Sequence, residues 1–170
     1  MKKVLIVVDM QKDFIDGALG TAEAVAIVPH VISKIKEYEA NGDVIIYTKD
    51  THFENYLSTR EGANLPVEHC IKGTPGHEIP ADILRSHELV FEKLTFGSIE
   101  LADYLHTLAF DAVELIGLCT DICVVSNALL IKAHFPECEV RVDPKCCAGV
   151  TPETHNAAIT TMRMCQIKVD

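Results

Sequence analysis

Short, continuous apolar runs alternate along this chain with longer segments of helical periodicity, and this alternation strongly constrains the fold. The runs are Val4–Val8, Val44–Tyr47, Leu89–Phe91, Ala112–Leu118, Val140–Val142 and Gln166–Val169, of which the last two are weakest. Strands that are apolar at consecutive positions are buried on both faces, which is typical of a parallel sheet covered by helices. The pattern therefore predicts an α/β fold with three αβα layers and a doubly wound, mainly parallel sheet of about six strands.

The segments between the runs carry helical signals. Ala22–Ala40 has apolar residues at helical spacing and is followed by Asn41-Gly42, a common helix stop. Three further helices are expected over Ser98–Leu108, over Asp121–Ala133 and from Thr151 onward, with Ser98 and Thr151 as N-caps. The chain has 170 residues and shows no internal repeat or linker, so residues 1–170 are expected to form a single domain.

The charge balance excludes several classes of partner. The formal net charge is -10, and there is no basic stripe of the kind that binds nucleic acid or anionic membranes. The apolar run after Lys2-Lys3 is too short for a signal peptide, and no stretch approaches a membrane span. We therefore expect a cytoplasmic protein whose seven cysteines are reduced. Apolar helix surfaces also predict self-association into a homo-oligomer.

Several polar segments follow the apolar runs directly. Ligand sites of open parallel sheets form beyond the carboxyl ends of the strands. The segments at these ends are Asp9–Phe14, Lys49–His52, Glu92–Phe96 and Cys119–Cys123. They are expected to bring carboxylates, a lysine, a histidine and a thiol to one edge of the sheet. An irregular stretch from about 50 to 87 adds glycines and prolines, and a loop of that length is usually functional.

Cys123 differs from the other cysteines because it lies about one turn into the helix that follows the fourth run. At such a position, unpaired backbone N–H groups and the helix dipole lower the pKa of a thiol. Asp9 could accept the thiol proton, and Lys93 could favour the ionised forms of both. The plain alternatives are that Cys123 is an ordinary buried cysteine and Lys93 a surface lysine. An acid such as Asp9 or Asp13 could also only cap the next turn.

A second group of side chains has the chemistry of a metal site. Asp50 and His52 stand two residues apart, and therefore on the same side of a strand. The loop that follows contains further candidates, namely Glu54, Glu61, His69 and His77. Imidazole and carboxylate ligands suit zinc, manganese or iron(II). An isolated D-x-H pair is common without a metal, so the additional residues in the loop support the prediction of a divalent metal.

Five segments resemble the isochorismatase-like cysteine hydrolase superfamily, and within it nicotinamidases most closely. They read DMQKDF at 9–14, DTH at 50–52, HCIKGTPG at 69–76, EK at 92–93 and GLCTDIC at 117–123. The similarity runs from residue 4 to about residue 160, and the D-x-Q-x-D-F and G-x-x-T-D-x-C elements are specific in combination. It implies the Rossmann-like fold of that superfamily and hydrolysis of a small amide, with nicotinamide converted to nicotinic acid and ammonia.

The resemblance also implies roles for individual residues. Asp9, Lys93 and Cys123 would form a catalytic triad, with a thioester forming on Cys123. The peptide bond between Leu118 and Cys119 would be cis, and the backbone N–H groups of Cys119 and Cys123 would form an oxyanion hole.

The resemblance further implies a divalent metal ion, with zinc favoured over manganese and iron. Its ligands would be Asp50, His52 and His69, with Glu61 as fourth ligand and Glu54 as second choice. Phe14 and Phe96 would be the aromatic walls of the substrate pocket. The family has an aromatic residue and prolines before the last histidine, whereas this chain reads LPVEH at 65–69, so Leu65 is expected to form an aliphatic wall.

Three other functions stay open at this point. A cysteine hydrolase of carbamoyl or ureido compounds would use the same scaffold and would be favoured by the absence of bound metal. An isochorismatase-type hydrolase of vinyl ethers needs no cysteine nucleophile. A binding protein without activity could also keep the fold, although titratable groups gather where catalysis would need them.

Overall fold

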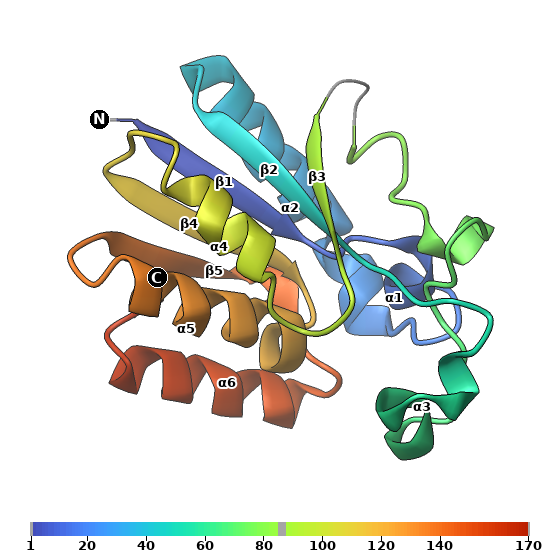
Figure 1. Ribbon diagram of the computed structural model, residues 1–170. Coiled ribbons are helices and arrows are strands. Elements are labelled where there is room, and N and C mark those ends of the chain that lie inside the picture. The colour runs from blue at the N-terminus through green and yellow to red at the C-terminus, as the bar shows by residue number, and fades with distance from the viewer. Residues whose placement is uncertain (1, 85–87, 170) are drawn as a thin grey trace.

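The computed structural model describes residues 2–84 and 88–169, and its centre is a six-stranded sheet (Figure 1). The strands are β1 (Lys3–Val8), β2 (Val44–Asp50), β3 (Leu89–Lys93), β4 (Ala112–Leu118), β5 (Glu139–Ala148) and β6 (Lys168–Val169). Their order is β3-β2-β1-β4-β5-β6, and every neighbouring pair is parallel. The predicted three-layer α/β fold is confirmed, and the sheet is entirely rather than mainly parallel.

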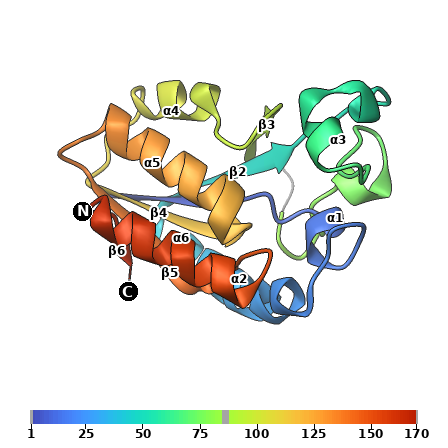
Figure 2. The same cartoon turned by 90° about the horizontal axis from the view of Figure 1, so that it is seen from below.

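Helices cover both faces of this sheet. The α-helices of the described residues are α1 (Lys12–Ile15), α2 (Ala22–Asn41), α3 (Arg60–Asn64), α4 (Ile99–Leu105), α5 (Val125–His134) and α6 (Pro152–Met164), and four of them, α2, α4, α5 and α6, lie against the sheet. One face packs against α2, and the opposite face packs against α4, α5 and α6 (Figure 2). Strand β1 shows why its apolar run is continuous, because Leu5 and Val7 face α2 while Val4, Ile6 and Val8 face the other layer. Both faces of the strand are therefore removed from water.

The expected helix boundaries are set by local hydrogen bonds. Gly42 ends α2 in the left-handed conformation, with φ of 68°, which a residue without a Cβ adopts at no steric cost. The predicted N-caps are confirmed, since Ser98 Oγ accepts from Leu101 N and Thr151 Oγ1 accepts from Thr154 N. Among the described residues, none of the helices combines the length and apolar character needed to span a bilayer.

Two regions contain more regular structure than the sequence predicted. The stretch expected to be irregular includes α3 and two 3₁₀ turns, Tyr56–Ser58 and Pro75–His77. These elements are too short for apolar periodicity to reveal them, and residues 85–87 of that stretch lie outside the described residues. Strand β5 continues well beyond the predicted Val140–Val142, although a register shift against β4 interrupts the pairing.

The carboxyl ends of β1 and β4 approach each other closely at Gly117. A Cβ at this position would lie 2.1 Å from the backbone oxygen of Val8, and φ of Gly117 is 116°. Only glycine fits such a contact without displacing one of the strands. The close approach places Asp9, which follows β1, beside the segment that follows β4.

Candidate active site

Three strand ends bring Asp9, Lys93 and Cys123 together. Asp9 follows β1 with φ of 46°, Lys93 is the last residue of β3, and Cys123 lies in a π-helical turn, Thr120–Val124, between β4 and α5. Lys93 Nζ lies 2.5 Å from Asp9 Oδ2 and 3.3 Å from Cys123 Sγ. All three residues are buried, so the lysine is in the core and not on the surface.

The surroundings of the Asp9–Lys93 pair hold it in place. Asp9 Oδ1 accepts a hydrogen bond of 2.6 Å from Thr48 Oγ1. Burial raises the pKa of Asp9, although the positive charge of Lys93 acts in the opposite direction. Burial alone would lower the pKa of Lys93, but the negative charge of Asp9, followed by those of Cys123 and Asp50, raises it. The lysine therefore stays an ammonium ion, and the carboxyl group is able to take up a proton.

The expectation of a lowered thiol pKa at Cys123 is wrong. Burial raises the pKa of Cys123 well above its ordinary value, and the charge of Asp9 adds to this effect, while Lys93 opposes it. The residue also precedes α5 in the π-helical turn and does not lie in the first turn of a regular α-helix. A thiol in this environment is protonated at rest and needs a neighbouring base before it can act as a nucleophile.

The segment after β4 begins with a cis peptide bond between Leu118 and Cys119. Its two polar residues are held by the loop before α6 and by α6 itself. Thr120 Oγ1 lies 2.8 Å from His155 Nδ1, and the carboxylate of Asp121 accepts a hydrogen bond from Val150 N. The turn that carries Cys123 is therefore fixed from both the sheet and the α6 side.

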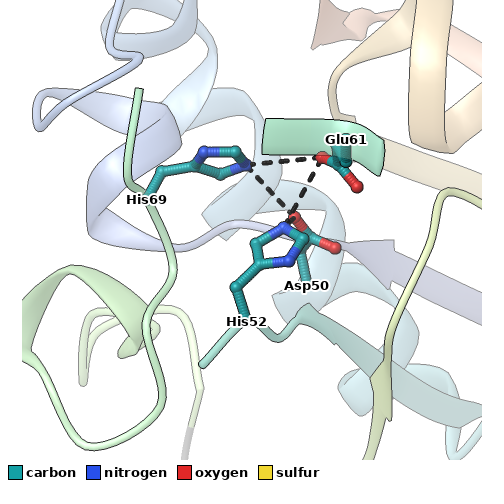
Figure 3. Close-up of side chains that lie close together, drawn as sticks. All are labelled: Asp50, His52, Glu61 and His69. Atoms are coloured by element: carbon teal, nitrogen blue, oxygen red, sulfur yellow. Dashed lines mark hydrogen bonds and ion pairs between the residues drawn. The ribbon is translucent and has the colours of Figure 1, made fainter. Parts of the chain in front are cut away.

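Four side chains form a compact group next to this site (Figure 3). They are Asp50 at the end of β2, His52 and His69 in the loops, and Glu61 in α3. One ligand atom from each lies within 4.8 Å of the others. His52 Nε2 is 2.9 Å from Asp50 Oδ2 and 3.5 Å from Glu61 Oε1, and His69 Nε2 is 3.5 Å from Asp50 Oδ2. The structure thus brings Glu61 into the group, whereas Glu54 lies exposed outside it.

This donor set fits a divalent metal ion. His69 Nδ1 lies 2.8 Å from the carbonyl of Val67, and since a carbonyl can only accept, Nδ1 carries a proton. Nε2 is then the nitrogen that could offer a lone pair to a metal ion, once the proton that it shares with Asp50 has left. Burial would raise the pKa of Asp50, but hydrogen bonds from His52 and His69 and the charge of Lys93 lower it. Two imidazoles and two carboxylates, mostly buried, are a ligand set that zinc accepts.

Several residues that support these two groups were assigned no role from the sequence. Gln11 is buried and makes two hydrogen bonds to the backbone of Asp50. Its Oε1 accepts from Asp50 N at 2.7 Å, and its Nε2 donates to Asp50 O at 2.8 Å. Tyr56 packs its ring against His52 and His69, with centroid distances of 4.7 and 5.1 Å. A glutamine three residues after the first strand was a usable signal, whereas a tyrosine within an irregular stretch was not.

The remaining candidates from the sequence have other partners. Asp13 accepts a hydrogen bond of 2.8 Å from Cys70 N, so this acid has a structural role and Asp9 is the one beside the thiol. His77 pairs with Thr51 Oγ1 at 2.9 Å and lies outside the metal-ligand group.

The thiol and the four-residue group face the same cavity of about 620 Å³. A volume of this size is typical of small-molecule sites. Its walls include the three side chains expected there from the resemblance, Phe14, Leu65 and Phe96. Phe14 is buried beside His69, whereas Leu65 and Phe96 are partly exposed at the cavity wall.

The chain is similar in sequence and in fold to several known proteins. A family model described as the isochorismatase domain matches residues 3–169. The nicotinamidase/pyrazinamidase of Mycobacterium tuberculosis is 27% identical over 183 residues, which cover 98% of this chain and 97% of that protein. The crystal structure of a pyrazinamidase of Pyrococcus horikoshii in complex with zinc superposes with a TM-score of 0.89 at 32% identity, covering 100% of this chain and 99% of that one. N-carbamoylsarcosine amidase from Thermoplasma acidophilum superposes with a TM-score of 0.82 at 27% identity, covering 100% and 96%.

Proposed function

This chain belongs to the isochorismatase domain family, and we propose that it is a cysteine-dependent amidohydrolase that converts nicotinamide to nicotinic acid and ammonia. The observation that carries the proposal is that Cys123 lines the same cavity as a metal-ligand group, while Lys93 lies beside its sulfur and is paired with Asp9. Relatives named nicotinamidase or pyrazinamidase that align over nearly the whole chain support it.

The first half of the proposed reaction forms a thioester. Asp9 takes the proton from the thiol of Cys123 as the sulfur attacks the amide carbon, and the nearby ammonium of Lys93 favours the thiolate. Backbone N–H groups of Cys119 and Cys123 would hold the oxygen of the tetrahedral intermediate, and each such donor contributes about 2.7–4 kcal/mol. Asp9 then returns its proton to the amide nitrogen, the C–N bond breaks and ammonia leaves.

The second half releases the acid. Asp9 accepts a proton from a water molecule, whose oxygen attacks the thioester carbon, and the C–S bond then breaks. The proton on Asp9 goes to the leaving sulfur, which restores the thiol of Cys123. One water molecule is consumed and one ammonia is released per cycle, and the same carboxyl group acts in turn as base and acid.

The substrate ring would lie between the walls of the cavity. Phe14 and Phe96 would flank it, and Leu65 would close the aliphatic side. Asp50, His52, Glu61 and His69 would hold a divalent ion, zinc in preference to manganese or iron(II). When bound, such an ion supplies a Lewis acid that could accept the lone pair of the pyridine nitrogen. The structurally similar pyrazinamidase of Pyrococcus horikoshii, which was crystallised in complex with zinc, supports zinc as the metal.

The setting of the reaction is part of the same proposal. All seven cysteines are free, which supports a reducing compartment such as the cytoplasm. The partner we propose is a small amide and no macromolecule, while assembly into a homo-oligomer stays a prediction from the sequence.

The direct test is an ammonia-release assay on the purified protein with nicotinamide, in the presence of added zinc, manganese or iron(II). We expect ammonia and nicotinic acid in equal amounts. Hydrolysis of a panel of other small amides, with nicotinamide untouched under every metal condition, would overturn the substrate assignment.

A second candidate function is hydrolysis of an N-carbamoyl compound. The observation in its favour is the superposition on N-carbamoylsarcosine amidase over nearly the whole of both chains. Activity on N-carbamoyl compounds that persists after the protein has been stripped of metal would favour this function over the first. Loss of activity on removal of metal, with recovery on its return, would favour nicotinamide.

Replacing Glu61 by glutamine is expected to weaken metal binding by more than about 100-fold. Loss of a residue that only supports a metal ligand already weakens binding by roughly 10–100-fold, and Glu61 would be a ligand itself. The measurement is metal content by mass spectrometry after dialysis against a weak chelator. Glu54→Gln is the matched control, because Glu54 lies nearby in the chain and outside the group, so it should retain the wild-type metal content. Equal metal content in the two variants would contradict the assignment of Glu61.

A further inference from the structure

Asn127 is a fully buried amide in the first turn of the apolar helix α5, and its side chain makes three hydrogen bonds. Its Oδ1 accepts from Ser98 N at 2.9 Å. Its Nδ2 donates to the carbonyl oxygens of Phe96 at 3.0 Å and of Cys123 at 2.8 Å. Both N–H groups of the amide are thereby used, one on the loop that carries Phe96 and the other on the turn that carries Cys123.

The loop between β3 and α4 depends on these bonds for its position. It starts directly after Lys93 and carries Phe96, which forms a wall of the cavity. The two large apolar side chains of this loop are not packed into the core, since Leu94 is 68% and Phe96 is 42% exposed. Apolar burial therefore does little to fix the loop, whereas Asn127 holds the backbone on both sides of Gly97.

We propose that Asn127 is a positioning residue that ties the Phe96 wall to the turn that carries Cys123, and so sets the width of the ring site in front of the thiol. Asn127 does not line the cavity, so it acts through the two segments that it joins. The inference rests on the proposed function for the nature of the substrate. It follows that Asn127 matters more for an amide with a ring than for a small acyclic amide, which does not reach the wall.

The structure offers a matched control for a general loss of stability. Ser98 caps α4 through a hydrogen bond from Leu101 N to its Oγ, and this bond does not involve Asn127. Ser98→Ala removes the cap and destabilises the helix start, but it leaves the backbone N–H of residue 98 able to donate to Asn127. A merely structural effect should therefore appear in both variants, whereas loss of positioning should appear only when Asn127 changes.

The test compares Asn127→Leu with Ser98→Ala in the full-length protein. In Asn127→Leu, we expect backbone hydrogen exchange over residues 94–98 to be roughly tenfold faster, because two hydrogen bonds to this loop are lost. The ratio of kcat/KM for nicotinamide to kcat/KM for acetamide should fall by roughly 10–100-fold, the cost of a displacement of about 1 Å at a reacting site. Ser98→Ala should change neither quantity by a comparable amount.

Two results would overturn the inference. One is wild-type hydrogen exchange over residues 94–98 in the Asn127 variant, which decides the matter whatever the enzyme hydrolyses. The other is wild-type selectivity in a variant whose loop exchanges faster. If Asn127→Leu fails to fold, Asn127→Ser, which keeps one hydroxyl donor, takes its place with smaller shifts in the same directions. Failure of the wild-type protein to hydrolyse nicotinamide is a separate result, which overturns the proposed function and leaves the exchange test in force.

Discussion

Replacing Cys123 by alanine is expected to lower kcat for amide hydrolysis by roughly 10⁴-fold or more, because the covalent route has no nucleophile without the sulfur. The protein should still fold, since the change removes one buried atom and leaves the Asp9–Lys93 pair intact. The measurements are ammonia release at saturating substrate and thermal unfolding. Activity in the variant within tenfold of the wild type, on nicotinamide or any other amide, would refute the role of Cys123.

Cys147 provides the control for this experiment. It is as buried as Cys123, with 4% exposure for each residue, and it lies in the same core cluster but away from the cavity. Cys147→Ala should therefore lower stability to a similar degree and leave kcat close to the wild-type value. A loss of activity shared by both variants would point to damage to the core.

Replacing Asp9 by asparagine is expected to lower kcat by roughly 10²–10⁴-fold, the usual contribution of a general acid or base. It should also lower the free energy of unfolding by about 3–5 kcal/mol, because the buried ammonium of Lys93 loses its nearest carboxylate, at 2.5 Å, and keeps the longer contact of 3.4 Å with Asp50 Oδ1. Urea unfolding and steady-state kinetics measure the two effects.

The double variant Asp9→Asn with Lys93→Met separates stability from catalysis. Removing the ammonium together with its nearest carboxylate avoids a buried charge that has lost its closest partner, so the double variant should be more stable than Asp9→Asn alone. It should remain as inactive, since the proton acceptor is still missing. Recovery of activity together with stability would show that Asp9 serves the fold and not the reaction.

The sequence predicted the fold well because the apolar pattern of each strand shows on its own how that strand is buried. Continuous apolar runs such as Val4–Val8 require burial on both faces, and a parallel sheet between helix layers provides it. The same rule about strand ends predicted that residues from β1, β2, β3 and β4 meet at one edge. The 3₁₀ turns and α3 were missed because such short elements leave no periodic pattern, and the extension of β5 was missed because Asp143-Pro144-Lys145 interrupts its apolar run.

The choice of metal ligand and the pKa of the thiol depend on distances and burial in the folded chain, which the spacing of residues along the sequence does not give. The sequence could not decide between Glu61 and Glu54, since the choice depends on α3, whose N-cap Thr59 sets where Glu61 points. The pKa of Cys123 was predicted with the wrong sign, because burial outweighs the expected effect of a helix start. Asn127 was recognisable in principle, as a lone amide within a strongly apolar helix.

The central claim is acyl transfer through the sulfur of Cys123. It is tested most directly by adding hydroxylamine, which competes with water for the thioester and gives a hydroxamate where water gives the acid. Nicotinamide and its matching methyl ester would pass through the same thioester, so the account predicts the same ratio of hydroxamate to nicotinic acid from both donors at every hydroxylamine concentration. It also predicts no hydroxamate from the Cys123→Ala protein. Ratios that differ between the two donors would contradict a common acyl-enzyme.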